Sequence, residues 1–209
     1  MQFIAHRGHW LKPEEKNTPE ALLRALAAGY GVETDLRDAG GRLVVSHDPA
    51  GGESLLAEDF FGLYTGAMAS APLALNIKAD GLRPLLKPML QRHGIENYFC
   101  FDMSVPETLG YQREGLRYFT RESEIEPSPV LYYQATGVWL DMFYSDWLQS
   151  TDIKRHLAAG KEVAVVSPEL HRRPHLAFWQ RLREAGIGRE SRIMFCTDFP
   201  AEAAAFFHD

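Results

Sequence analysis

The chain has 209 residues, of which 45% are hydrophobic, and its formal net charge is −6. This length and composition predict a single domain, residues 1–209, with a full-sized core. The negative charge argues against a nucleic-acid partner, because domains that bind phosphate backbones usually carry a basic excess. No apolar run approaches the roughly 20 residues that a membrane-spanning helix needs.

Cys100 and Cys196 each lie within an apolar, strand-like run. We therefore expect buried free thiols and not a disulfide or a metal site. No charged-then-apolar leader is visible before the first strand. A cytoplasmic protein is the expectation that fits these features best, and its oligomeric state is left open.

The first 48 residues predict two strands, a helix and a further short hairpin strand. Residues 3–5 form an apolar run that opens into a loop at His6. Thr18 and Pro19 are typical of the start of a helix, and Gly29 stops it. Residues 32–36 form the second strand, and a glycine turn leads to the short strand 42–46.

Strand and helix patterns continue to alternate after an irregular segment at 48–72. The further predicted strands are 73–77, 98–101, 116–119, 138–142, 163–166 and 193–196, and the helices are 82–93, 106–115, 147–160, 174–186 and 200–207. Residues 120–136 are polar and proline-rich, so they are predicted mostly as loop. Eight principal strands with intervening helices predict an α/β fold, the (β/α)8 TIM barrel. A doubly wound open sheet is the alternative.

Polar residues follow the apolar runs, at the carboxyl ends of the predicted strands, where active sites of such barrels lie. Glu33 and Asp35 are two residues apart on one strand, so their side chains point to the same face. Two carboxylates side by side are tolerated when they are solvated or when a cation lies between them. The other polar residues at strand ends are His6, His47, Lys78, Asp102, Ser167 and Asp198.

Several short motifs, in this order and spacing, resemble the glycerophosphodiester phosphodiesterase family, whose relatives include phosphatidylinositol-specific phospholipases C. They are IAHRG at 4–8, NTPEA at 17–21, VETDL at 32–36 and LVVSHD at 43–48, with looser matches at LNIK (75–78) and CTDFP (196–200). The resemblance implies a (β/α)8 barrel, in agreement with the strand count.

The resemblance also implies roles for individual residues. His6 and His47 would be the general acid and base, a role that suits imidazole because its unperturbed pKa is about 6.5. Glu33 and Asp35 would ligate a divalent cation, Mg²⁺ or Ca²⁺, both of which prefer oxygen ligands. The phosphate of a small-molecule phosphodiester would be bound by Arg7 and also by Lys78.

The chain departs from the family pattern in three places. The usual Glu-x-Lys reads Asn76-Ile77-Lys78, so Asn76 would offer an amide oxygen as metal ligand and hold the cation more weakly. The usual Glu-Asn-Thr reads Lys16-Asn17-Thr18. The segment after the His-Asp motif is short, which predicts an open entrance to the active site of the barrel. The expected substrate is a glycerol or polyol phosphodiester with a bulky leaving group.

The loop after the seventh strand, residues 167–172, is expected to overhang the same mouth, where Glu169 or His171 would touch substrate. We take Glu169 as the candidate for substrate binding. Two other functions stay open. Asn76 allows a non-catalytic protein that binds a phosphorylated ligand, and Lys78 alone would suit a barrel enzyme of the aldolase or sugar-phosphate isomerase kind.

Overall fold

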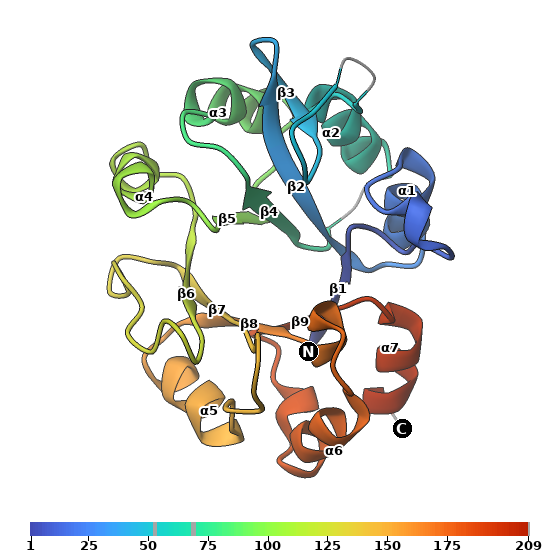
Figure 1. The fold of residues 1–209 in the computed structure, drawn as a ribbon, viewed down its shortest axis with the longest axis vertical. Helices are drawn as coiled ribbons and strands as arrows, with labels where there is room; N and C mark the ends of the chain where they lie inside the picture. Colours follow the sequence, from blue (N-terminus) through green and yellow to red (C-terminus); the bar gives the residue numbers. More distant parts are fainter. Residues whose placement is uncertain (52–53, 68–69, 209) are drawn as a thin grey trace. The chain divides into compact units, whose positions relative to one another are not determined.

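The computed structural model describes residues 1–51, 54–67 and 70–208. The chain divides into two compact units, one formed by Met1–Ile4 with Phe119–Asp209 and the other by Ala5–Tyr118. We call them unit 1 and unit 2. Strands and helices alternate along both units, as the sequence predicts (Figure 1).

Unit 2 is built on a parallel sheet in which β4 lies between β2 and β5. The short strand β3 pairs with β2 in the antiparallel direction. Parallel pairing in register sets Asp35 on β2 opposite Asn76 on β4. The strands are β1 (Gln2–His6, whose end enters this unit), β2 (Gly31–Ala39), β3 (Arg42–Val45), β4 (Leu73–Ile77) and β5 (Tyr98–Phe101).

Helices α1 (Pro19–Ala27), α2 (Ala57–Gly66) and α3 (Arg83–Arg92) of unit 2 each bury a mainly apolar face. In α1 this face is formed by Ala21, Leu22, Ala25 and Leu26, at the spacing of an amphipathic helix. The Thr18 side chain accepts a hydrogen bond from the Ala21 N–H and so caps α1, as predicted. The helices are η1 (Pro13–Glu15), α1 (Pro19–Ala27), α2 (Ala57–Gly66), α3 (Arg83–Arg92) and α4 (Val105–Arg113).

The strands of unit 1 are also parallel, in the order β9-β8-β7-β6. The rings of Trp179, Phe195 and Phe207 pack together in this unit, and the ring of Phe3 packs against the two phenylalanines. The strands are β6 (Phe119–Glu122), β7 (Gly137–Leu140), β8 (Glu162–Val166) and β9 (Ile193–Thr197). The helices are α5 (Ser150–Ala158), η2 (Pro168–His171), α6 (Leu176–Glu184), η3 (Ile187–Arg189) and α7 (Pro200–His208).

Two predictions of local structure were wrong. The segment 48–72 is not irregular throughout, because it contains helix α2; Gly52 in that segment lies outside the described residues. The sixth strand runs from Phe119 to Glu122 and not from 116 to 119. Its two charged residues, which suggested a loop, are paired: Arg121 with Glu126, and Glu122 with Arg155 at 2.7 Å.

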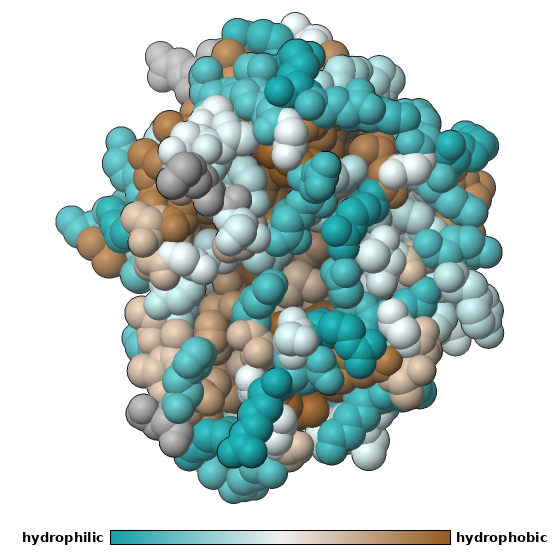
Figure 2. All heavy atoms as spheres, turned by 180° about the vertical axis from the view of Figure 1, so that it is seen from behind, coloured by the Kyte–Doolittle hydropathy of each residue, from teal (hydrophilic) through white to brown (hydrophobic). Residues whose placement is uncertain are grey.

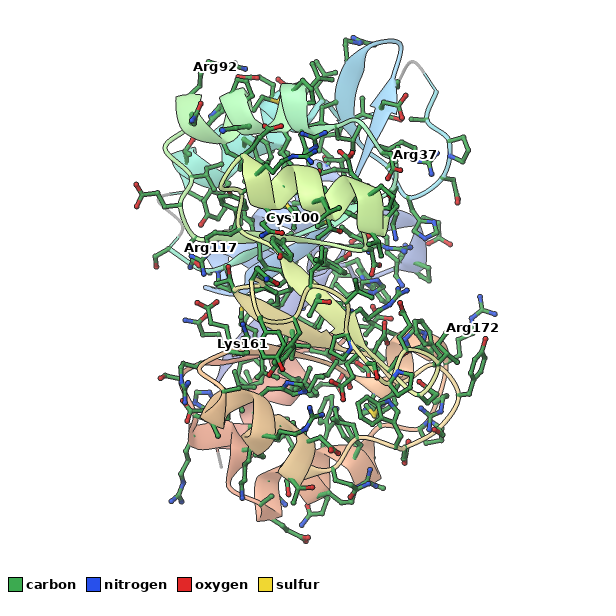
Figure 3. All side chains as sticks on the ribbon, turned by 90° about the vertical axis from the view of Figure 1, so that its left-hand side faces the viewer. Arg37, Arg92, Cys100, Arg117, Lys161 and Arg172 are labelled. Atoms are coloured by element: carbon green, nitrogen blue, oxygen red, sulfur yellow. The ribbon has the colours of Figure 1, made fainter. Side chains whose placement is uncertain are left out.

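The expectation for the cysteines is confirmed, since Cys100 and Cys196 are both free and buried. On the face shown in Figure 2, hydrophilic side chains surround smaller hydrophobic areas. Figure 3 places Cys100 in the interior of unit 2. None of the described helices is long and apolar enough to cross a membrane.

Candidate active site

The turn after β1 carries Arg7 into the candidate site. Arg7 adopts a left-handed backbone conformation (φ 57°), and so does Asn17 (φ 61°). The Asn17 backbone N–H donates to the Arg7 carbonyl oxygen at 2.9 Å, which ties the two residues together. Gly8 lies between the turn and α1 with φ 89°, and a Cβ atom there would lie 2.7 Å from the carbonyl carbon of Ala21.

Asp35 is the centre of the charged cluster in unit 2 and is fully buried. Its Oδ2 atom lies 2.9 Å from Nε of Arg7 and accepts a hydrogen bond from Nδ2 of Asn17 at 2.8 Å. Its Oδ1 atom lies 3.3 Å from Nζ of Lys78. Burial of a carboxylate is costly unless it is paired, and these contacts provide the pairing.

Glu33, the other carboxylate on this face of β2, is 2% exposed. Its Oε2 atom accepts a hydrogen bond from the Arg7 backbone N–H at 3.2 Å and lies 3.9 Å from Nε2 of His6. Burial, together with the negative charge of Asp35, raises the pKa of Glu33 to about 8. A buried acid with such a pKa either holds a proton or needs a nearby cation.

Asn76 brings an amide oxygen to the same place. Its Oδ1 atom is buried and receives no hydrogen bond from any residue that the structure describes. Its side chain also bonds to the Glu33 carboxylate and so favours the ionised form of that acid. The Oδ1 atom of Asp35 likewise receives no hydrogen bond within the described chain.

Two carboxylates and an amide oxygen that receives no hydrogen bond form a ligand set that suits a hard divalent cation. The described residues contain no cluster of three or more His, Cys, Asp and Glu side chains arranged for a metal. The set here has two such side chains and depends on Asn76 for the third oxygen. The residues therefore fit a cation, with one negative charge fewer than a three-carboxylate site.

His47 lies at a cleft of about 530 Å³ that Arg7 also lines. Its side chain is 45% exposed, and Nδ1 lies 3.0 Å from Oδ1 of Asp48. The sequence-predicted residues His6, Arg7, Glu33, Asp35, His47, Asn76 and Lys78 all belong to unit 2. The structure thus joins six of them through the contacts given above and connects His47 to them through the cleft lining that it shares with Arg7.

Glu169 is placed elsewhere, in unit 1, on η2. Its carboxylate accepts hydrogen bonds from the hydroxyl groups of Ser167 and Thr197 and from the Asp198 backbone N–H. These contacts join the end of β8 to the end of β9, which gives Glu169 a structural task. Its role in substrate binding stays a prediction. Arg172, beyond it, extends away from the unit into solvent (Figure 3).

Sequence reasoning left Asn17 and Lys16 out of the candidate set, although both line the cleft. Asn17 bridges to β2 twice, since its Oδ1 also accepts a hydrogen bond from the Thr34 hydroxyl at 2.8 Å. The feature of the sequence that could have identified them is their position just before the Thr18 helix cap, where Asn17 begins the motif NTPEA. What the sequence could not show is that Asn17, in a left-handed backbone conformation, directs its side chain back to Asp35.

No protein-family profile matches the sequence, and no curated protein matches it either. Solved structures do. The glycerophosphodiester phosphodiesterase of Agrobacterium tumefaciens matches with a TM-score of 0.72 at 18% identity, covering 100% of both chains. A phosphodiesterase of Oleispira antarctica, solved with its product sn-glycerol-3-phosphate, matches with a TM-score of 0.69 at 14% identity, covering 100% of this chain and 97% of that one.

A Ca²⁺-dependent phosphatidylinositol-specific phospholipase C of Streptomyces antibioticus matches with a TM-score of 0.58 at 13% identity, covering 99% of this chain and 95% of that one. These likenesses establish the fold class. The chain has the (β/α)8 barrel fold, as predicted, and the doubly wound sheet is excluded. In particular, the fold is shared along the whole chain with glycerophosphodiester phosphodiesterases.

Proposed function

We propose that this protein hydrolyses small-molecule phosphodiesters of glycerol or a related polyol. The observation that carries the proposal is the cluster around Asp35, in which two buried carboxylates, two cationic side chains and an amide oxygen without a hydrogen bond converge. It lies at the carboxyl ends of strands, where barrel enzymes hold their active sites. The likeness in fold to phosphodiesterases supports the same reaction class.

In this proposal His6 and His47 exchange protons with the substrate. His6 is held near the Glu33 carboxylate, with Nε2 3.9 Å from Oε2, and His47 stands at the cleft against Asp48. One imidazole removes the proton from the attacking hydroxyl, and the other protonates the leaving oxygen. The attacking hydroxyl is the one next to the ester, so its attack on phosphorus releases the other alcohol and gives a cyclic phosphate. The two imidazoles then reverse roles when water attacks this cyclic phosphate and opens it.

Arg7 and Lys78 bind the phosphoryl oxygens. Both side chains are about one-fifth exposed and already point at the cluster through their contacts with Asp35. The planar guanidinium of Arg7 offers a fork of donors, and the ammonium of Lys78 adds a point charge. Together they offset the charge that develops on phosphorus-bound oxygens in the transition state.

Glu33, Asp35 and Asn76 would hold a divalent cation, Mg²⁺ or Ca²⁺. When bound, it would supply Lewis-acid stabilisation to the phosphoryl group and lower the pKa of a coordinated hydroxyl. The raised pKa of Glu33 and the two oxygens without hydrogen-bond donors support this ligand set. The Ca²⁺ dependence of one protein of like fold supports a divalent ion in general.

The proposal is tested by assaying glycerophosphocholine and its deoxy analogue, which lacks the hydroxyl next to the ester, with and without a chelator. We expect turnover of the first, loss of activity on chelation, and little turnover of the analogue, because the neighbouring hydroxyl attacks phosphorus. Equal rates on both would mean direct attack by water. Binding of glycerol 3-phosphate without turnover of any diester would favour a non-catalytic binding protein, which Asn76 makes the second candidate.

A further inference from the structure

Arg37 is a third charged residue on the face of β2 that carries Glu33 and Asp35. Side chains at alternate positions of a strand point to the same side, and two residues span about 7 Å. Arg37 lies where β2 leaves its parallel neighbour β4 and pairs with β3 (Figure 3). It therefore stands one step beyond Asp35 toward the carboxyl end of the strand, the end at which barrel enzymes bind their substrates.

The guanidinium of Arg37 is held at this place by a neutral group. Its Nη2 atom donates a hydrogen bond to the backbone carbonyl oxygen of Lys78 at 3.0 Å. The side chain of the same lysine reaches the cluster, because its Nζ lies 3.3 Å from Oδ1 of Asp35. Arg37 is thus tied to the backbone of a residue of the cluster, and its guanidinium has a defined position beside the end of β4.

Arg37 forms no ion pair with any residue that the structure describes. The residue is half-buried, and its Nε atom is buried without a hydrogen-bond acceptor in the same part of the chain. Arg7 and Lys78 differ from it, since both are paired with the Asp35 carboxylate. A half-buried cation is costly to keep without an anion, so the partner that this guanidinium lacks is an anionic group of a ligand.

We propose that Arg37 is a specificity-determining residue that binds a carboxylate or phosphate group on the leaving alcohol of the diester. The inference rests on the proposed phosphodiesterase function, in which the phosphoryl group lies at the cluster around Asp35. Arg37 is about 7 Å farther along β2, so it meets the part of the substrate that extends toward the entrance. The planar fork of a guanidinium matches the oxygens of either anion. The preferred substrate class is a glycerophosphodiester with an acidic leaving alcohol.

Two isosteric substrates test it, the glycerophosphodiesters of 4-hydroxybutanoate and of 4-hydroxybutanamide, which differ only in the charge of the distal group. At low ionic strength we expect the wild-type KM to be about five- to tenfold lower for the acid than for the amide, the size of one charge-assisted contact. In Arg37→Gln this ratio of KM values should fall to about one. Arg37→Lys should keep a preference for the acid, reduced by the loss of the planar fork.

Arg42→Gln is the matched control, because it removes the same charge from an exposed position at the outer end of the same β2–β3 hairpin. It should keep the wild-type ratio, and an equal loss of the preference in both variants would assign the effect to general electrostatics. Equal KM values for the two diesters in the wild type would overturn the inference. So would a KM that rises equally for both diesters in Arg37→Gln, which would assign Arg37 to the phosphoryl group.

Calorimetric binding of the same two diesters separates this inference from the proposed function. If the wild type cleaves neither diester, the hydrolytic function fails. Tighter binding of the acid than of the amide, lost in Arg37→Gln and kept in Arg42→Gln, would still support the role of Arg37 in binding the anionic group. Equal binding of the two diesters by the wild type would remove that role as well.

Discussion

At the scale of single residues, Asn76 decides how strongly the cluster attracts a cation. It stands in register with Asp35, and its Oδ1 atom receives no hydrogen bond from the described chain. Asn76→Glu adds a carboxylate at that point, so we expect calorimetry to show about tenfold tighter binding of Mg²⁺ or Ca²⁺. Unchanged or weaker binding would exclude Asn76 as a ligand.

The matched control is Asn97→Glu. Asn97 is an exposed residue of the same unit, and its side chain bonds to the Ser70 carbonyl oxygen, away from the cluster. The substitution Asn97→Glu adds the same charge as Asn76→Glu without adding a ligand. We expect it to change the cation affinity by less than about twofold, the range of a screened surface charge. An equal gain in both variants would assign the effect to net charge.

The sequence indicated the residue types of this cluster but not their electrostatic state. Alternation on one strand is enough to place Glu33 and Asp35 on one face. The pairing of Asp35 with Arg7, Asn17 and Lys78 depends on three other elements, which sequence spacing does not bring together. The partners of Glu169 were equally unpredictable from sequence spacing, because only the fold shows that the hydroxyl groups of Ser167 and Thr197 donate to its carboxylate.

At the scale of elements, the turn between β1 and α1 sets the position of Arg7, and Gly8 permits that turn. A Cβ atom there would meet the Ala21 carbonyl group at 2.7 and 2.9 Å, at a φ of 89°. We expect Gly8→Ala to lower the free energy of unfolding by about 2–4 kcal/mol, from backbone strain and from displacement of α1. Denaturant unfolding measures it.

Gly29→Ala is its control, because Gly29 also has a positive φ, 78°, but nothing lies within 4 Å of an added Cβ. It should lose only about 1 kcal/mol, the ordinary cost of a left-handed alanine. If the free energy of unfolding fell by the same amount in both variants, the close approach of Gly8 to α1 would make no contribution to stability.

The order of strands and helices was predictable because each element keeps its own hydrophobic period. Helix α2 was missed because its start at Leu56 has no side-chain cap and its interior contains Gly62, both of which read as loop. Strand β6 was predicted too early in the chain because Glu122 is polar and yet only 4% exposed. The partner that makes this burial possible, Arg155, lies 33 residues away.

At the scale of the whole molecule, stability in acid should depend on His156, in unit 1. This histidine is fully buried, and its Nδ1 lies 2.9 Å from the Tyr132 hydroxyl. Burial, assisted by the charge of Arg155, lowers the pKa of His156 to about 4. Between about pH 6.5 and 4 the unfolded chain therefore binds a proton at this imidazole that the folded chain does not bind. The free energy of unfolding falls as pH falls through this window.

Replacing His156 by glutamine should remove up to about 3 kcal/mol of this pH dependence, measured as unfolding free energy at pH 7 and pH 4. The reference is His208→Gln, an exposed histidine on α7 of the same unit, which should follow the wild-type curve. Parallel curves for wild type and His156→Gln would contradict the assignment of the acid lability to His156.

The most direct measurement is turnover of glycerophosphocholine by His6→Ala and His47→Ala, with folding checked by circular dichroism and His208→Ala as reference. If these two imidazoles transfer the protons, each variant loses at least about 10²-fold in kcat while His208→Ala keeps wild-type turnover. Near-normal turnover in either folded variant would contradict the role of that histidine, and near-normal turnover in both would refute the proposed acid–base mechanism.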